Sequence, residues 1–204
     1  MCGIFGIAAI ESKYDKKDLL KILRCLAVYS QVRGKDSSGV VFRIDNVSQF
    51  EVLKGPVSID ELLLTSDYKL LETKVNENYG GRNVFAAIGH ARLVTNGSQL
   101  KDENNQPVIK DGIVGVHNGI IVNDNEIWSR HSDLRRKYEI DTEVIFSLFR
   151  KYLKIHNCSI KAIKETNKEI SGTISTGYFI DNRDEMVMFT NNGSLYYTTN
   201  YKDI

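Results

Sequence analysis

Short apolar segments that follow one another as hairpins are the feature of this sequence that most constrains its fold. Segments joined by short turns pair antiparallel, whereas a parallel doubly wound sheet needs a helix between successive strands. The order therefore predicts an α+β fold, a four-layer αββα sandwich of two mostly antiparallel sheets with helices outside. The strands are expected at residues 2–10, 38–45, 47–55, 84–93, 112–121, 172–181, 185–192 and 194–200.

The segments between these hairpins show helical periodicity, which predicts helices there. Lys16–Ser30 places Leu19, Leu20, Leu23, Leu26 and Ala27 on one face, and Asp15 is suited to cap it. Residues 58–75 read as one helix or as two short ones. Further helices are expected at residues 141–155 and 159–170, after a long polar loop that holds "KDENNQP" between two strands.

Composition narrows the classes of function. The chain has 204 residues, a size suited to one domain, and a net charge of +1, which provides no strong field toward nucleic acid or an acidic membrane surface. Its apolar runs are too short to span a bilayer, and its beginning does not have the pattern of a signal peptide. Three cysteines without framework spacing favour a reducing, cytoplasmic setting. We expect Cys25 to be packed and Cys158 to be inert.

Several stretches carry more chemistry than a structural element needs, although each has an ordinary interpretation. The Asn118–Gly119 pair alone indicates a hairpin turn, and Asp141 alone indicates a helix N-cap. Arg92 alone is typical of a surface cation, and Cys2 alone of a small buried side chain. Only their combination favours a functional site. The stretches are "MCGIF", "VRGKDSSG", "GHARLVTNG", "HNGII" and "IDTEVI".

Together these motifs resemble the class II glutamine amidotransferases, whose glutaminase domain is an N-terminal-nucleophile (Ntn) hydrolase. The family shows Cys-Gly-Ile at the mature start, Arg-Gly-x-Asp-Ser, Gly-His-x-Arg followed by Thr, His-Asn-Gly, and an acid before Thr/Ser-Glu. All five occur here in family order. The resemblance is nearest to the glucosamine-6-phosphate synthase and phosphoribosylpyrophosphate amidotransferase branch. It implies one type-2 glutamine amidotransferase domain over residues 1–204. From the strand count and the order of the hairpins, we expect the Cys2 strand at the centre of the sandwich and the active site at one end of the two sheets.

The resemblance implies that Cys2 is the nucleophile that hydrolyses L-glutamine to L-glutamate and ammonia. Once Met1 is removed, the α-amine of Cys2, with a pKa of roughly 8, can accept the proton of its own thiol. With Met1 in place that nitrogen is an amide and the base is lost. The side chain of Asn118 and the backbone N–H of Gly119 are then the donors to the oxyanion.

The α-carboxylate and α-ammonium groups of glutamine, its amino-acid head, need their own contacts. Arg92 is expected to grip the α-carboxylate as a fork, and Asp141 to pair with the α-ammonium. Thr95 and Asn96 are expected to help bind the substrate. Supporting roles around the new N-terminus and the strand ends fall to Gly3, Arg33, Asp36, His90 and His117, the two histidines through hydrogen bonds.

The chain also departs from the family pattern. Leu93 stands where the sugar synthases have Trp, and Asn96 where they have His. The family's domain continues for several strands beyond "NGSLYY", so the chain is expected to be a fragment or a minimal version, truncated at its C-terminus. No acceptor domain is recognisable, so ammonia would pass to a partner synthase domain or subunit. We expect no cofactor and no metal, because His131 and His156 lack partners at ligand spacing.

Three other classes remain open. A papain-like cysteine hydrolase would also use Cys, His and Asn, but its cysteine begins a helix rather than a strand. A catalytically inactive glutaminase-like regulatory or interaction module would keep the fold without the activity. An Ntn hydrolase acting on another amide would not need both Arg92 and Asp141.

Overall fold

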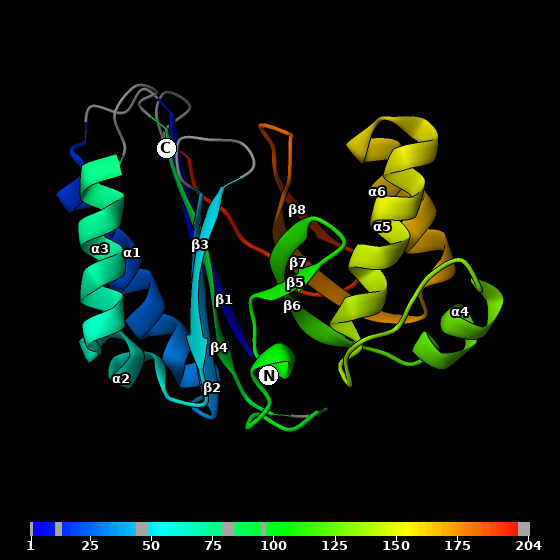
Figure 1. The fold of residues 1–204 in the computed structure, drawn as a ribbon, viewed down its shortest axis with the longest axis horizontal. Helices are drawn as coiled ribbons and strands as arrows, with labels where there is room; N and C mark the ends of the chain where they lie inside the picture. The colour runs from blue at the N-terminus through cyan, green and yellow to red at the C-terminus, as the bar shows by residue number, and fades with distance from the viewer. Residues whose placement is uncertain (1, 11–13, 44–48, 79–83, 95–96, 200–204) are drawn as a thin grey trace.

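The computed structural model describes residues 2–10, 14–43, 49–78, 84–94 and 97–199. Two β-sheets lie face to face, with helices on the outer side of each (Figure 1). The predicted α+β, four-layer αββα arrangement is therefore confirmed.

The first sheet is wholly antiparallel and has the order β1-β4-β2-β3. Among the described strands, β1 lies at the edge of this sheet, so the expectation of a central Cys2 strand is wrong. Its one partner strand is β4, with Gly3 opposite Ala91. β1 nevertheless contacts β6 (Ile113–Ile121) of the other sheet. The strands are β1 (Gly3–Ile10), β2 (Ser37–Arg43), β3 (Phe50–Gly55) and β4 (Val84–Arg92).

The second sheet is also antiparallel, with the order β5-β6-β7-β8. The short strand β5 lies in the segment that was expected to be a polar loop. The predicted strand at 194–200 is wrong over its described part, because Ser194–Thr199 forms no strand. Asn191 caps the end of β7 instead: its side chain accepts from Ile174 N–H and donates to Gly172 O, and the chain turns away. The strands are β5 (Val108–Lys110), β6 (Ile113–Ile121), β7 (Gly172–Ile180) and β8 (Met186–Thr190).

The helices largely follow the sequence prediction. α1 spans Lys16–Ser30, and Asp15 caps it by accepting from Asp18 N–H at 2.8 Å. The region from 58 to 75 forms two helices, because Thr65 is extended and interrupts the run. The short helix α4 was not predicted. The remaining elements are α2 (Ile59–Leu64), α3 (Ser66–Asn78), α4 (Asp124–Arg130), α5 (Thr142–His156), α6 (Ser159–Glu169) and the 3₁₀ turns η1 (Gln31–Arg33) and η2 (Asp102–Asn104).

Two side chains of α1 do not lie where the helical pattern put them. Cys25 is exposed, and Leu26 is 38% exposed. The helix turns only Leu19, Leu20, Leu23 and Ala27 fully toward the first sheet, so Cys25 falls on its solvent side. Within the described residues, no helix combines the length and the apolar character that a membrane crossing requires.

Three apolar layers hold the sandwich together. One lies between α1–α3 and the first sheet, and another between α4–α6 and the second. The third lies between the sheets and sets how they stack; its buried members are Val41, Ala86, Ile88, Val114, Val116 and Phe179.

Replacing Ile88 by Ala should lower the free energy of unfolding by about 2–5 kcal/mol, because Ile88 is 1% exposed in the layer between the sheets and its loss leaves a cavity. Urea denaturation measures this. Ile10→Ala, at a position 61% exposed on β1, is the control and should change stability by less than about 1 kcal/mol. Equal losses for the two variants would show that the layer between the sheets does not hold them together.

Candidate active site

Cys2 lies immediately before β1 and is half-buried. Its thiol donates to the backbone oxygen of Leu93, just after β4, over 3.4 Å. Gly3 follows as the first residue of β1, and its backbone abuts Ser30 at the end of α1. A cavity of about 570 Å³ opens beside Cys2, and Asn118 and Gly119 of β6 line the same cavity. The thiol and the two expected oxyanion donors are thus brought to one space.

Gly119 is a position that only glycine fits. Its φ is +156°, and a Cβ built there would lie 1.8 Å from Thr173 O of β7. β6 and β7 approach so closely here that any side chain would separate them. The absence of a side chain keeps the backbone of Gly119 at the wall of the Cys2 cavity.

His117 fastens this end of β6 to its neighbours. Its Nδ1 lies 3.2 Å from Thr142 Oγ1 at the start of α5, and its Nε2 lies 3.2 Å from Thr173 O. Burial lowers the pKa of His117, although the carboxylate of Asp141, 3.9 Å from Nδ1, works in the opposite direction. The buried ring therefore acts as a neutral link between β6, β7 and α5.

Asp141 occupies the N-cap position of α5 but does not cap it through its side chain. Its carboxylate instead accepts from Ile121 N–H at the end of β6, at 2.8 Å. The side chain is 13% exposed and lies near the His117 ring. Asp141 thus holds a negative charge at the same end of β6 that presents Asn118 and Gly119.

Arg92 ends β4 and is not a surface cation, because it is only 4% exposed. Its guanidinium donates to Asn105 Oδ1 at 3.2 Å and to Gly97 O at 3.4 Å. Burial lowers the pKa of Arg92, while the charges of Cys2, Asp141 and Asp36 oppose that shift. The guanidinium therefore shares an electrostatic environment with the thiol and with Asp141. Thr95 and Asn96 lie outside the described residues.

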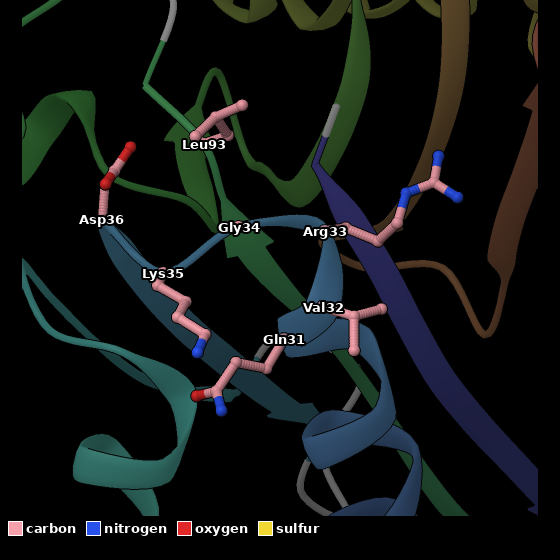
Figure 2. Close-up of a pocket in the computed structure, with 7 residues that line it drawn as sticks. All are labelled: Gln31, Val32, Arg33, Gly34, Lys35, Asp36 and Leu93. Atoms are coloured by element: carbon pink, nitrogen blue, oxygen red, sulfur yellow. The ribbon is translucent and has the colours of Figure 1, made fainter.

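Arg33 and Asp36 belong to the loop between α1 and β2, which surrounds a second cavity of about 530 Å³ (Figure 2). Asp36 holds the end of β4: its carboxylate accepts from Val94 N–H at 2.8 Å, and its N–H donates to Arg92 O at 3.0 Å. Arg33 points away from the rest of this loop and also lines the Cys2 cavity. Leu93 lines the second cavity and is 42% exposed.

His90 does not make the hydrogen bonds that were expected of it. It is completely buried in β4, and neither ring nitrogen has a hydrogen-bond partner among the described residues. Burial, and next the positive charge of Arg92, lower the pKa of His90 to about 3. His90 therefore lies in the interior as a neutral ring.

One wall of the Cys2 cavity was not predicted from the sequence. Part of it comes from β7, through Thr173 and Ser175. The rest comes from the segment after β8, which runs back toward the first sheet (red in Figure 1). The alternating Thr-x-Ser pattern of "GTIST" could have indicated a polar face on β7. Nothing local marks the other members, which are Asn192, Gly193, Ser194 and Tyr196.

The described residues contain no group of three or more His, Cys, Asp or Glu side chains arranged to hold a metal ion. His131, one of the two histidines considered for a metal, lies 2.6 Å from Glu169 and 2.8 Å from Lys151 Nζ. It takes part in a polar network between α4, α5 and α6.

Two antiparallel sheets between helical layers, with a cysteine ahead of the first strand, define an α+β fold of the Ntn hydrolase type. The family model described as "Glutamine amidotransferase domain" matches residues 90–203. The chain belongs to this family, as a class II glutamine amidotransferase domain.

Individual relatives agree with this assignment. The chain is 33% identical over 194 residues to glutamine–fructose-6-phosphate aminotransferase (isomerizing) of Clostridium perfringens, covering 92% of this chain and 28% of the relative. It is 28% identical to an amidophosphoribosyltransferase of Archaeoglobus fulgidus, covering 89% of this chain and 37% of that one. The chain thus spans 28% and 37% of the lengths of these two proteins.

A solved structure shares the fold. Glutamine phosphoribosylpyrophosphate amidotransferase from B. subtilis, complexed with ADP and GMP, superposes with a TM-score of 0.67 at 21% identity. The match covers 93% of this chain and 37% of that chain.

Acidification should destabilise the protein through its buried histidines. The folded state keeps His90 neutral down to a pKa of about 3, and the pKa of His117 is also lowered, whereas the ordinary imidazole value is 6.5. Below pH 6.5 the unfolded chain therefore binds more protons, and stability falls as the pH drops. Between pH 6 and 5 we expect a loss of about 1 kcal/mol per pH unit for each ring that stays neutral.

Urea denaturation at several pH values measures this slope, and His90→Gln is the variant that tests its origin. Removing the titrating ring should reduce the slope by about 1 kcal/mol per pH unit. An unchanged slope would mean that His90 is not the group responsible.

Proposed function

We propose that residues 1–204 act as one glutaminase domain that hydrolyses L-glutamine to L-glutamate and ammonia. The observation that carries this proposal is the single cavity lined by Cys2, Asn118 and Gly119. The amino-acid head of glutamine requires two charges: Arg92 ends β4, the strand paired with β1, and Asp141 bonds to the end of β6. Membership of the class II family agrees with this chemistry.

Cys2 supplies the nucleophile after Met1 is removed. The free α-amine accepts the thiol proton, and the thiolate attacks the side-chain amide carbon of glutamine. The tetrahedral intermediate collapses to a thioester, and the nitrogen leaves as ammonia with the proton returned by the α-ammonium. Water, activated by the same amine, then hydrolyses the thioester and releases glutamate.

The end of β6 stabilises the intermediate. The amide of Asn118 and the N–H of Gly119 donate to the oxygen that becomes negatively charged, and one such donor typically lowers the barrier by about 3–4 kcal/mol. Thr173 O, which lies against Gly119, and the buried ring of His117 keep this strand end in place.

The head of glutamine is bound away from the reacting amide. Arg92 pairs with the α-carboxylate and Asp141 with the α-ammonium, and Thr95 and Asn96 add contacts from the loop after β4. A substrate without that head would not bring the opposite charges that match the largely buried Arg92 and Asp141. This requirement favours glutamine over other amides.

The ammonia is proposed to pass to a synthase domain or subunit. The names of the relatives describe transfer to fructose 6-phosphate in one case and phosphoribosyl transfer in the other. Glutamine amidotransferase domains of this length form part of those longer proteins. For this chain too, we propose that ammonia, and not glutamine, reaches the acceptor site on that synthase domain or subunit.

Cys2→Ala should abolish ammonia release from glutamine, because no other described residue lining the cavity carries a thiol that can form the thioester. A coupled glutamate dehydrogenase assay measures the activity, and intact mass should show that the active protein lacks Met1. Cys2→Ser serves as a comparison and should retain at most a trace, because a hydroxyl is a weaker nucleophile than a thiol near neutral pH. A wild-type protein that neither releases ammonia nor is labelled at Cys2 by a glutamine-like electrophile is instead an inactive module.

Arg92→Ala and Asn118→Ala should affect different kinetic constants. Arg92→Ala should raise KM strongly, by the equivalent of about 2–3 kcal/mol, since it removes a charge-assisted contact to the substrate. Asn118→Ala should lower kcat by about 10²–10³-fold, since its donor acts mainly on transition-state charge.

Steady-state kinetics on folded variants separates these effects, with Arg92→Lys as the matched control for charge without the guanidinium fork. The lysine variant should recover only part of the affinity. Normal glutamine binding by Arg92→Ala, together with a pure affinity loss in Asn118→Ala, would reverse the roles assigned to these residues.

A further inference from the structure

The side chain of Gln106 makes two hydrogen bonds to a single residue of β6. Its Oε1 accepts from His117 N–H at 2.6 Å, and its Nε2 donates to His117 O at 2.9 Å. Gln106 is 7% exposed, and both bonds are buried. Its amide thus pairs with both backbone polar groups of the residue directly before Asn118.

The position of this contact follows from the register of the second sheet. β5 pairs with β6 through Val108 opposite Gly115, so continuing that register would place residue 106 opposite residue 117. β5 begins only at Val108, however, so the backbone of Gln106 makes no ladder pair with β6. The side-chain amide of Gln106 takes over the hydrogen bonds that a longer β5 would have made, at a point where the edge of β6 would otherwise be bare.

Gln106 also contacts the first sheet through its backbone. A Cβ at Gly39 of β2 would lie 2.3 Å from Gln106 O, so the two main chains touch. Gly39 pairs with His90 of β4 on one side and with Lys54 of β3 on the other. One residue therefore packs its main chain on the first sheet and hydrogen-bonds its side chain to the second.

The carbonyl of His117 belongs to the peptide plane that leads into Asn118. When Nε2 of Gln106 holds that carbonyl, it fixes the orientation of the plane and hence the direction of the Asn118 side chain. The ring of His117 is held separately by Thr142 and Thr173 O, on contacts that do not involve this peptide. Asn105, next to Gln106, accepts from Arg92 and so faces the substrate clamp instead.

We propose that Gln106 is a positioning residue for the oxyanion donors Asn118 and Gly119, acting through the backbone of His117; this inference rests on the proposed glutaminase function. Gln106 is not among the described residues that line the Cys2 cavity. Its contribution is to hold the strand end at the geometry that the transition state needs, where a misplacement of about 1 Å can cost on the order of 10²-fold in rate.

Gln106→Met removes both hydrogen bonds at similar side-chain length. We expect kcat for glutamine hydrolysis to fall by about 10-fold or more, with KM within about 2-fold of wild type, because the clamp for the amino-acid head is untouched. Steady-state kinetics measures the split, and urea denaturation measures the accompanying loss of stability.

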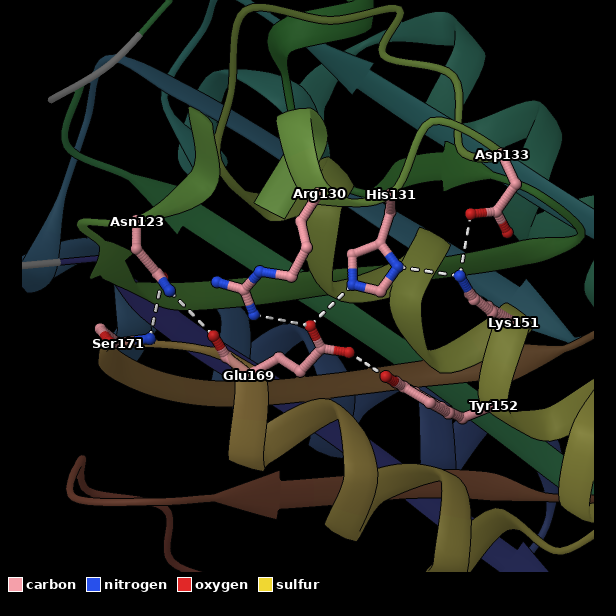
Figure 3. Close-up of polar contacts among 8 residues, drawn as sticks. All are labelled: Asn123, Arg130, His131, Asp133, Lys151, Tyr152, Glu169 and Ser171. Atoms are coloured by element: carbon pink, nitrogen blue, oxygen red, sulfur yellow. Dashed lines mark hydrogen bonds and ion pairs between the residues drawn. The ribbon is translucent and has the colours of Figure 1, made fainter. Parts of the chain in front are cut away.

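Asn123→Leu is the matched control. Asn123 makes the same kind of two-bond contact elsewhere: its amide donates to Glu169 O at 2.8 Å and accepts from Ser171 N–H at 2.8 Å (Figure 3). It fastens the turn after β6 to the α6–β7 connection, and it has no place in the site. Its replacement should lower stability while kcat stays within about 2-fold of wild type. Equal kcat losses in both variants would reduce Gln106 to a general structural contact and overturn the proposal.

Gln106→Glu gives a pH signature that a structural role alone would not give. As a carboxylate, residue 106 presents an oxygen to His117 O and repels it; as a carboxylic acid, it donates to that oxygen and restores both bonds. Burial raises the pKa of a carboxyl group, which brings this change toward neutral pH. The ratio of variant to wild-type kcat should therefore rise several-fold as the pH is lowered from 8.5 to 6, with KM unaffected.

The outcomes separate this inference from the proposed function. A wild-type protein without glutaminase activity overturns both. An active wild type with unchanged kcat in Gln106→Met, or with a flat pH ratio in Gln106→Glu, overturns only the positioning role. If the Met variant does not fold, the Glu variant compared with itself across pH decides the question.

Discussion

The buried layer between the two sheets is the constraint on which the site depends. Val41, Ala86 and Ile88 of the first sheet pack on Val114, Val116 and Phe179 of the second. This packing fixes how far one sheet can slide over the other. Because Cys2 and Arg92 lie at an end of the first sheet, and Asn118 near an end of the second, the same packing sets how these groups face one another. The apolar interior is therefore what aligns the polar groups.

The site carries a cost in buried charge and buried polarity that the rest of the fold must offset. Arg92 is 4% exposed, and the His90 ring is completely buried, with no hydrogen-bond partner for either nitrogen among the described residues. Burial disfavours the charged forms of Arg92, His90 and His117 alike, as their lowered pKa values indicate. Such groups weaken a protein unless nearby packing is extensive, and here the clusters on both sides of each sheet provide it. The buried polar groups of the site thus lower the stability of the fold locally, and the surrounding apolar layers offset this loss.

The sequence predicted what depends on local pattern or on side-chain chemistry. The bounds of α1 and its Asp15 cap follow from periodicity and capping, and both are confirmed. Cys2, Asn118 and Gly119 were expected from the set of motifs that resembles the class II family, and the structure places them in one cavity.

The remaining features depend on contacts distant in sequence. No local sequence pattern indicates Gln106, because its side chain contacts His117, 11 residues further along the chain. β5 has three residues, too few for any alternation to be visible. The segment after β8 has strand-like composition but forms no strand, since Asn191 ends the pairing with β7. Cys25 was misplaced because a helical stripe does not show how wide the buried face is.

The segment from Gly97 to Pro107 contacts both Arg92, which is proposed to bind the substrate, and the strand that carries the proposed oxyanion donors. Asn105 contacts the guanidinium of Arg92, and the next residue, Gln106, contacts the strand that carries Asn118. A displacement of the whole segment would therefore affect both contacts, whereas Gln106→Met removes only the one to β6. Lys54 of β3 anchors the segment by donating to Asn105 O at 2.9 Å. Because this anchored segment contacts both sheets, it would link the proposed binding of the amino-acid head to the proposed stabilisation of the oxyanion through the backbone.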